Sequence, residues 1–147
     1  MQSEKFTALV RNAIGAAQSA ALAANHQKLT AEHVLAALLK DDNMTVKMLL
    51  AKAGADSASL STLLKAGLDK FPQVTGSGAG QLQLDADLAR IFAAVEAEAK
   101  ARHDQFIAVD LLLLAMTKST GSVGKILKKA GVEPAPLGAA IDEMRKG

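Results

Sequence analysis

Apolar residues recur along the chain at spacings of three and four residues, which is the pattern of amphipathic helices with one buried face. In the segment from about Ser3 to Asn25, this stripe comprises Phe6, Leu9, Val10, Ala13, Ala17 and Ala20. The stripe predicts a first helix in that segment. Ser3 is its expected N-cap, because a serine side chain can accept a hydrogen bond from the first N–H groups of a helix.

Residues that begin or end helices divide the rest of the chain into seven further helices. Thr30 is an expected N-cap, and Glu32 in the following turn suits the positive end of the helix dipole. Gly54 and Gly131 are expected just after helix ends, because glycine readily adopts the left-handed conformation found there. The predicted segments are one after Thr30 that buries Val34, Leu35, Leu38 and Leu39, about Met44–Ala53, Asp56 to the residue before Phe71, about Asp85–Arg102, Ala108–Lys118, Ser122–Ala130 and Pro134–Arg145.

The two halves of the chain repeat one another. A shift of 77 residues places His26 on His103 and aligns the tripeptide that ends in Gly54 with the one that ends in Gly131. Further matched pairs are Ile14/Ile91, Leu35/Leu112, Val46/Val123 and Leu50/Leu127. The same shift serves along nearly the whole chain without an insertion, and a fixed internal period predicts a duplicated unit of secondary structure.

These patterns predict an all-α fold, an eight-helix bundle made of two four-helix repeats related by a pseudo-twofold axis. We expect a single domain over 1–147, with repeat one at 3–71, a glycine-rich connector at 72–84 and repeat two at 85–146. Glycine, serine and proline give the connector no apolar face, so we expect it to be irregular and, at 75–80, the first segment that proteases cut.

Composition supports a helical core and argues against nucleic acid and membrane as partners. Half of the residues are apolar, whereas aromatic residues make up only 3% of the chain. The net charge is +2 with both signs interspersed, so no basic patch for nucleic acid stands out. The chain has no cysteine, which excludes disulfides and cysteine-based zinc sites. The apolar run Val109–Met116 is too short to cross a bilayer, and no signal peptide is recognised, so we expect a cytoplasmic protein.

Catalytic and cofactor motifs are weak. The segment from Gly121 to Ile126 resembles a phosphate-binding loop, but Ser119 stands where the first glycine belongs and Ile126 where serine or threonine follows the lysine. The shift of 77 places His26 and His103 at equivalent helix ends, where a structural role is expected, and no further ligands converge on them to hold a metal. We therefore expect no enzyme activity, no cofactor and no metal in this domain.

The seam between the two repeats is the remaining candidate for a functional surface. Two similar helical halves must meet there, and an apolar groove with a polar rim would suit a peptide segment. A closed core along the same seam is equally compatible with the sequence. Both interpretations remain open at this point, and the first predicts a polypeptide-binding module.

Several segments resemble one known family. His26–Leu39 (HQKLTAEHVLAALL) and its echo His103–Met116 (HDQFIAVDLLLLAM) resemble the repeat of the Clp amino-terminal domain. The connector Phe71–Gly80 (FPQVTGSGAG) and the following Leu84–Leu88 (LDADL) are similar to the ClpB branch of that family. The likeness covers essentially the whole chain and is specific as a doubled set with this connector.

The resemblance implies the N-terminal substrate-engaging domain of an ATP-dependent disaggregase. Such a domain binds unfolded or aggregated polypeptides weakly and helps deliver them to an ATPase ring. The ring is implied to be a homohexamer that uses ATP and Mg²⁺ and cooperates with the DnaK system, whereas the isolated domain is expected to be a monomer.

The resemblance also implies a set of substrate-binding residues. The polar ones are Thr7, Asp104 and Asp110, and the apolar groove residues are Ile91, Val95, Leu111 and Leu112. Asp104 and Asp110 flank the beginning of a predicted helix, so they also suit a capping role. The sequence does not decide between the two roles.

An alternative is the adaptor-binding domain of a ClpA- or ClpC-type protease chaperone. Some ClpC members are implied to read phosphorylated arginine through an acidic residue at the position of Glu32 in both repeats. Under the shift of 77, the second repeat opens with Ile107-Ala108-Val109-Asp110, which lacks both the Ser or Thr cap and the counterpart of Glu32. On this alignment the sequence favours the ClpB branch.

Overall fold

The computed structural model describes residues 3–40, 44–76 and 80–146, and it confirms the all-α fold. In the first half of the chain the elements are a 3₁₀ turn at Ser3–Lys5, α1 (Ala8–Ala23), β1 (Lys28–Leu29), α2 (Ala31–Lys40), α3 (Met44–Lys52) and α4 (Ser57–Asp69). In the second half they are β2 (Gln83–Leu84), α5 (Ala86–Ala101), α6 (Val109–Lys118), α7 (Ser122–Lys129) and α8 (Pro134–Lys146). The predicted cleavage segment at 75–80 falls partly on residues 77–79, which lie outside the described residues.

The register of the repeat differs from the sequence alignment. α1 and α5 begin at Ala8 and Ala86, a difference of 78 residues, and α2 (Ala31–Lys40) and α6 (Val109–Lys118) differ by the same 78. The glycines that end α3 and α7 differ by 77, as do α4 (Ser57–Asp69) and α8 (Pro134–Lys146). The single shift of 77 is therefore wrong for the first two helices of each repeat.

The corrected register changes which residues are equivalent. Asn25 and His103 are counterparts, and both have left-handed backbone angles, with φ of 59° and 62°, just after a helix end. His26 instead corresponds to Asp104, and Leu35 corresponds to Leu113. The equivalence of His26 with His103 was wrong because alanine-rich helices match almost as well one residue out of register.

The helix boundaries follow from their caps. Thr30 begins α2 as predicted, since its hydroxyl accepts the N–H of His33 at 3.3 Å. Ser3 does not cap α1, because it lies in the separate 3₁₀ turn; Thr7 does so, accepting the N–H of Val10 at 3.4 Å. Asp85 is the counterpart of Thr7 and caps α5 by accepting the N–H groups of Asp87 and Leu88. The second repeat thus uses a carboxylate where the first uses a hydroxyl.

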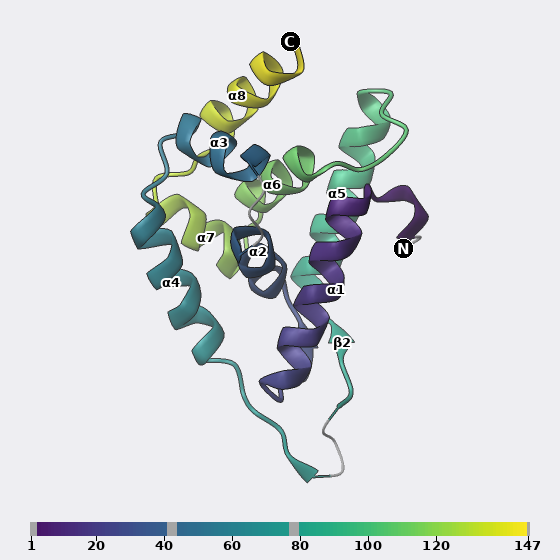
Figure 1. Ribbon diagram of the computed structural model, residues 1–147, viewed down its shortest axis with the longest axis vertical. Coiled ribbons are helices and arrows are strands. Elements are labelled where there is room, and N and C mark those ends of the chain that lie inside the picture. Colours follow the sequence, from purple (N-terminus) through teal and green to yellow (C-terminus); the bar gives the residue numbers. More distant parts are fainter. Residues whose placement is uncertain (1–2, 41–43, 77–79, 147) are drawn as a thin grey trace.

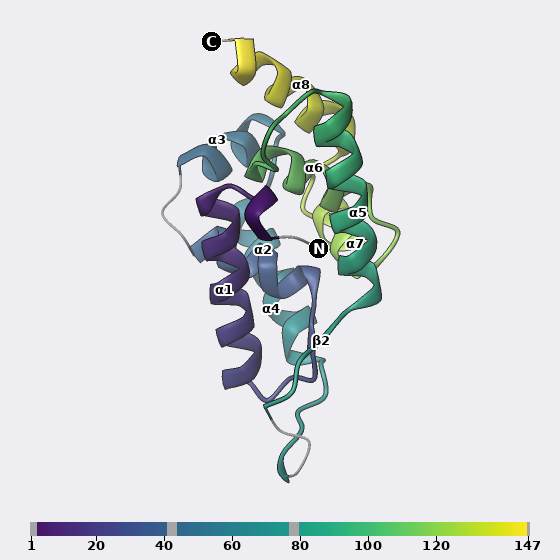
Figure 2. The ribbon, with the colours of Figure 1, turned by 90° about the vertical axis from the view of Figure 1, so that its right-hand side faces the viewer.

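The two repeats share one core. α2 and α6 lie at the centre, with α1 and α5 on opposite flanks (Figure 2). The other helices pack against helices of the opposite repeat, α4 on α7 and α3 on α8 (Figure 1). Near the pseudo-twofold axis, the N–H of Asp56 donates to the carbonyl of Ala130 at 2.9 Å. A single apolar cluster draws residues from both repeats.

In the part of the chain that the structure describes, no helix is both long enough and apolar enough to span a bilayer.

Candidate polypeptide-binding surface

Extended backbone joins the repeats at the seam between α1 and α5. β1 and β2 pair in parallel, and the N–H of Asp85 donates to the carbonyl of Leu29 at 3.0 Å. The counterpart of that bond runs from the N–H of Thr7 to the carbonyl of Ile107 at 3.1 Å. The helices that begin at these capping residues are therefore fixed to the opposite repeat at their first turn.

A hollow of about 460 Å³ lies at this seam. It is lined by Phe6, Arg11, Ile14, Gly15, Gln18, Leu29, Leu84 and Phe92. In the corrected register Phe6 corresponds to Leu84, and Ile14 corresponds to Phe92. Two pseudo-equivalent pairs thus face one another across the hollow, which places it at the pseudo-twofold axis.

The hollow has an apolar floor and a polar rim. The rings of Phe6 and Phe92 meet in the floor with centroids 5.5 Å apart, and both side chains are buried. Leu84 is 51% exposed, which is unusual for a large apolar residue of this chain, and Arg11 and Gln18 are exposed beside it. An aromatic floor beneath an exposed leucine is the arrangement expected of a site for an apolar side chain.

A charged cluster joins the end of α8 to the beginning of α6. Nε and Nη2 of Arg145 donate to the two carboxylate oxygens of Asp110 at 2.8 and 3.0 Å, while Nη1 donates to both oxygens of Asp104 at 3.1 and 2.9 Å. These hydrogen bonds to Asp110, and secondarily those to Asp104, raise the pKa of Arg145. Ile107, midway between the two aspartates in sequence, pairs with Phe6 in the hollow floor.

The equivalent corner of repeat one is a buried histidine cluster. The backbone N–H of Thr30 donates to Nδ1 of His33 at 3.0 Å, so this nitrogen carries no proton. The proton of His33 is therefore on Nε2, which donates to Nδ1 of His26 at 2.8 Å. Burial, followed by the neighbouring His26, lowers the pKa of His33 to about 4. The imidazole of His33 is thus neutral at pH 7.

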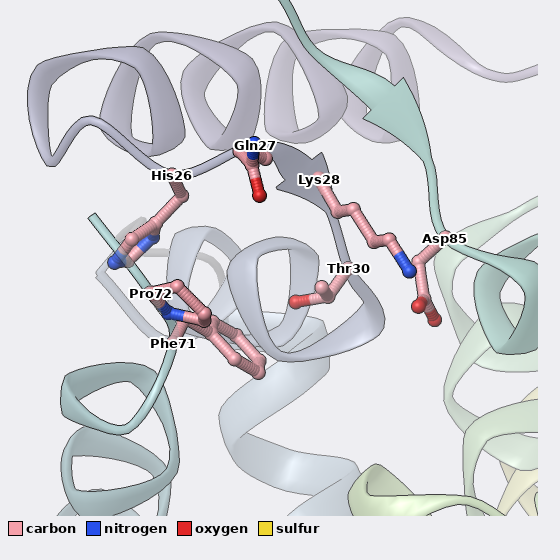
Figure 3. A pocket seen from close by; sticks show the side chains of 7 residues that line it. All are labelled: His26, Gln27, Lys28, Thr30, Phe71, Pro72 and Asp85. Atoms are coloured by element: carbon pink, nitrogen blue, oxygen red, sulfur yellow. The ribbon is translucent and has the colours of Figure 1, made fainter. Parts of the chain in front are cut away.

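A pocket of about 330 Å³ lies beside the histidine cluster, between β1 and the connector (Figure 3). The ring of Phe71 lies 5.5 Å from each imidazole, measured between centroids, and closes one side. Lys28 extends toward Asp85 on the opposite side (Figure 3). The connector is thereby anchored, and the N–H of Val74 donates to the carbonyl of Asn25 at 2.7 Å.

Glu32 and Asp110 are counterparts in the corrected register, both in the first turn of a central helix. The absence of an acidic residue opposite Glu32 was therefore an error of alignment. Ala108 corresponds to Thr30 and makes no capping hydrogen bond, as predicted for the second repeat. With an acidic residue at this position in both repeats, Glu32 does not distinguish the ClpB branch from the ClpA and ClpC alternative.

The four predicted apolar groove residues are buried, whereas the residues of an open groove would be exposed to solvent. Val95, Leu111 and Leu112 are at most 1% exposed and belong to the core, so a polypeptide could not reach them in this conformation. Ile91 is 3% exposed and borders a separate small hollow next to Arg90. Val95, Leu111 and Leu112 thus lie in the closed core, whereas an open hollow exists elsewhere on the same seam.

The three predicted polar residues are connected through Ile107. Thr7 caps α1 and bonds to Ile107, while Asp104 and Asp110 lie on either side of Ile107 in sequence. Sequence reasoning missed Leu84 and Arg145. A repeat alignment at a shift of 78 would have paired Leu84 with Phe6. No local feature of the sequence indicated Arg145.

The glycines of the segment at 121–126 have a packing explanation. Gly121 lies against the carboxylate of Asp87, and Gly124 lies against the backbone carbonyl of Ser119, leaving no room for a side chain at either position. Ser119 donates its hydroxyl to Asp87 at 2.9 Å. A carboxylate at the beginning of α7 would repel a phosphate.

Comparison with known proteins gives a consistent assignment. The sequence profile described as "Clp repeat (R) N-terminal domain" matches residues 5–130. Over its whole length the chain is 42% identical to the chaperone protein ClpB of Rhizobium meliloti and 40% identical to that of Rhodopseudomonas palustris. It spans 17% of the length of each of these relatives.

Solved structures share the fold. The Hsp104 N-terminal domain from Candida albicans has a TM-score of 0.82 and 20% identity, over 96% of this chain and 91% of that one. The ClpV N-domain in complex with a VipB peptide has a TM-score of 0.70 and 14% identity, over 86% and 79% of the two chains. With the profile match over most of its length, the chain belongs to the Clp repeat N-terminal domain family.

Proposed function

We propose that this chain is the substrate-engaging domain of a ClpB-type disaggregase and that it binds unfolded or aggregated polypeptide through the seam hollow. The observation that carries the proposal is the aromatic floor of Phe6 and Phe92 beneath the exposed Leu84. The similarity to ClpB chaperones over the whole chain supports the assignment to this branch. In a domain of the same fold, the ClpV N-domain, a peptide complex is known.

Binding is expected to be weak and tolerant of sequence. A disaggregase must accept many clients and release them to its pore, and an unfolded client loses conformational freedom when it docks. We expect a dissociation constant of tens of micromolar or weaker, which corresponds to a binding free energy on the order of −6 kcal/mol. Residues of the full-length protein outside this chain would form the hexameric ATPase ring, hydrolyse ATP with Mg²⁺ and cooperate with the DnaK system.

The experiment is an NMR titration with a permanently unfolded polypeptide, at low and high salt. Replacing Leu84 with Asp should weaken binding about fivefold, because the half-exposed leucine contributes roughly 1 kcal/mol when a ligand covers it. Met44→Asp is the matched control, since Met44 is 66% exposed on α3 and does not line the hollow. An apolar contact should survive added salt, whereas a charge-led contact should weaken.

The adaptor-binding function of a ClpA- or ClpC-type domain is the second candidate. It is favoured by the acidic residues Glu32 and Asp110 at equivalent positions of both repeats. The same titration separates the two candidates. Tight, salt-sensitive binding to a folded adaptor, with no binding to the unfolded chain, would reject the disaggregase proposal.

A further inference from the structure

β2 offers one edge to β1 and leaves its other edge without a partner strand among the described residues. The N–H of Gln83 donates to the carbonyl of Gln27 at 2.9 Å. The N–H of Asp85 donates to the carbonyl of Leu29 at 3.0 Å. Because successive residues of a paired strand direct their backbone groups to opposite edges, the N–H and carbonyl of Leu84 point away from β1.

This outer edge borders the seam hollow. The side chain of Leu84 lines the hollow and is 51% exposed, so a ligand can reach it. The rings of Phe6 and Phe92 form the floor of the same hollow. Unpaired N–H and carbonyl groups on an exposed strand are a template for another extended chain. A backbone edge and an apolar hollow thus meet at one residue.

The molecule already uses this mode of pairing at the equivalent place. The segment around Phe6 corresponds to β2, and Phe6 pairs in parallel with Ile107. The N–H of Ile107 donates to the carbonyl of Lys5 at 2.7 Å, and the N–H of Thr7 donates to the carbonyl of Ile107 at 3.1 Å. The side chain of Phe6 enters the core and is 4% exposed. Two backbone hydrogen bonds and one apolar side chain therefore attach a short segment to this fold.

We propose that a polypeptide bound at the seam adds to the outer edge of β2 as a short extended strand, with its backbone hydrogen-bonded to the N–H and carbonyl of Leu84 and one apolar side chain in the hollow. This inference rests on the proposed function and assigns recognition to the main chain of the client. Every residue except proline has the same backbone donor and acceptor, so such a site accepts many sequences that carry one apolar residue. Water competes for each backbone hydrogen bond, which agrees with weak binding.

β2 suits a transient strand rather than a lasting one. It is two residues long, and Asp85 follows it as the N-cap of α5. Short edge strands limit edge-to-edge association between copies of a protein. A client therefore makes a brief contact, and a second copy of the chain could pair only over the same two residues.

Hydrogen exchange of single amides, followed by NMR, tests the pairing directly. In the unbound chain the N–H of Leu84 should exchange rapidly, whereas those of Gln83 and Asp85 should be protected by β1. A permanently unfolded polypeptide at about four times its dissociation constant should slow exchange at Leu84 about fivefold and leave both neighbours unchanged. The same slowing on raising the concentration of the chain alone would show that a second copy occupies the edge, and would overturn the inference.

A methylated peptide series separates main-chain from side-chain recognition. The probe is a short peptide, acetylated and amidated at its ends, with leucine at its centre and threonine on both sides. Methylating one backbone nitrogen at a time removes one donor and changes no side chain. Affinity should fall at least about fivefold at one position near the leucine and little at its two neighbours, because neighbouring N–H groups face away from the edge.

A matched pair of variants tests the same bond from the side of the protein. Leu84→Pro removes the edge N–H and keeps the pairing with β1, since proline is tolerated on the outer side of an edge strand. Leu84→Ala also shortens the side chain but keeps the N–H. The proline variant should bind the peptide at least about threefold more weakly than the alanine variant, and thermal unfolding confirms that both are folded.

The outcomes distinguish this inference from the function on which it rests. If the peptide binds but methylation has equal effects at all positions, or exchange at Leu84 is not slowed, the inference is overturned and the proposed function stands. If neither the peptide nor the unfolded polypeptide binds, both are overturned.

Discussion

Two equivalent corners of the molecule hold their polar groups in opposite ways. In repeat one, His26, Glu32 and Leu68 occupy the places that Asp104, Asp110 and Arg145 occupy in repeat two. The first corner is buried and its two imidazoles are hydrogen-bonded to one another, whereas the second is a partly exposed ion cluster joined by four hydrogen bonds. The duplicated backbone has therefore been kept while the chemistry at this corner has diverged.

Glu32 and Asp110 show how the two corners differ in electrostatic environment. Glu32 is 4% exposed and its carboxylate accepts from the hydroxyl of Ser122 at 2.8 Å, and among the described residues no cation pairs with it as Arg145 pairs with Asp110. Burial raises the pKa of Glu32, with the nearby Asp85 and Asp87 adding to the effect. A buried carboxylate with no cation beside it is disfavoured, while the charge at the equivalent position of repeat two is compensated by a guanidinium.

The largest effects should come from the cores of the two repeats. Leu35 and Leu113 are counterparts in the corrected register and are at most 1% exposed. Leu35→Ala and Leu113→Ala should each lower the free energy of unfolding by roughly 2–5 kcal/mol, because each leaves a cavity in a packed core. Urea denaturation measures both. A loss below about 0.5 kcal/mol at either position would mean that this side chain is not packed in the core.

The histidine corner should make stability depend on pH. In the unfolded chain His33 takes up a proton below its usual pKa of 6.5, but in the folded state its pKa is about 4. Between these values the unfolded state binds more protons, so stability should fall as the pH is lowered from 6.5 toward 4. The slope from this one group should not exceed about 1.4 kcal/mol per pH unit.

The raised pKa of Glu32 acts with the opposite sign, because the folded state then binds a proton more readily than the unfolded state as the pH falls. Measuring the free energy of unfolding against pH in a Glu32→Gln background isolates His33. Adding His33→Gln should flatten the curve between pH 6.5 and 4. An unchanged slope would show that His33 does not remain neutral in the folded protein.

The two carboxylates should respond differently to neutral replacement. Asp110→Asn removes a charge that Arg145 pairs with, so we expect a loss of about 1–2 kcal/mol, reduced from the cost of a fully buried pair because Arg145 is partly exposed. Glu32→Gln removes a disfavoured charge and keeps an acceptor for Ser122, so at pH 7 it should be neutral or stabilising. Thermal unfolding of the two variants at equal salt checks the difference, and equal losses would contradict the comparison.

The sequence predicted the helices well because their signals are local. Thr30, Asp56 and Gly54 mark helix ends through their own side chains or backbone freedom, and the structure places them there. The register was missed by one residue in α1 and α2, because the change lies between α2 and the end of α3, where no distinctive residue marks it.

The site was less predictable, because it depends on contacts between distant residues. A leucine such as Leu111 has the same helical periodicity whether its face meets another helix or a ligand, so the sequence could not place it in the core. Arg145 lies 35 residues from Asp110, and only the docking of α8 on α6 brings its guanidinium to the carboxylates. Asp104 and Asp110 were predicted from the family resemblance, which does not indicate that they pair with Arg145.

The smallest effects should come from the paired N-caps, which test whether Thr7 is a structural or a binding residue. Asp85 accepts two N–H groups at the beginning of α5 and adds a negative charge near the helix dipole, whereas Thr7 accepts one N–H at a long 3.4 Å. Asp85→Ala should therefore cost about 1 kcal/mol and Thr7→Ala about 0.5 kcal/mol. Thr7→Ser keeps the hydroxyl and should cost less than either.

If Thr7 only caps α1, Thr7→Ser and Thr7→Ala should bind an unfolded polypeptide with equal affinity, despite their different stabilities. Weaker binding by Thr7→Ala alone, measured by NMR titration where both variants are fully folded, would instead place the hydroxyl in the binding surface.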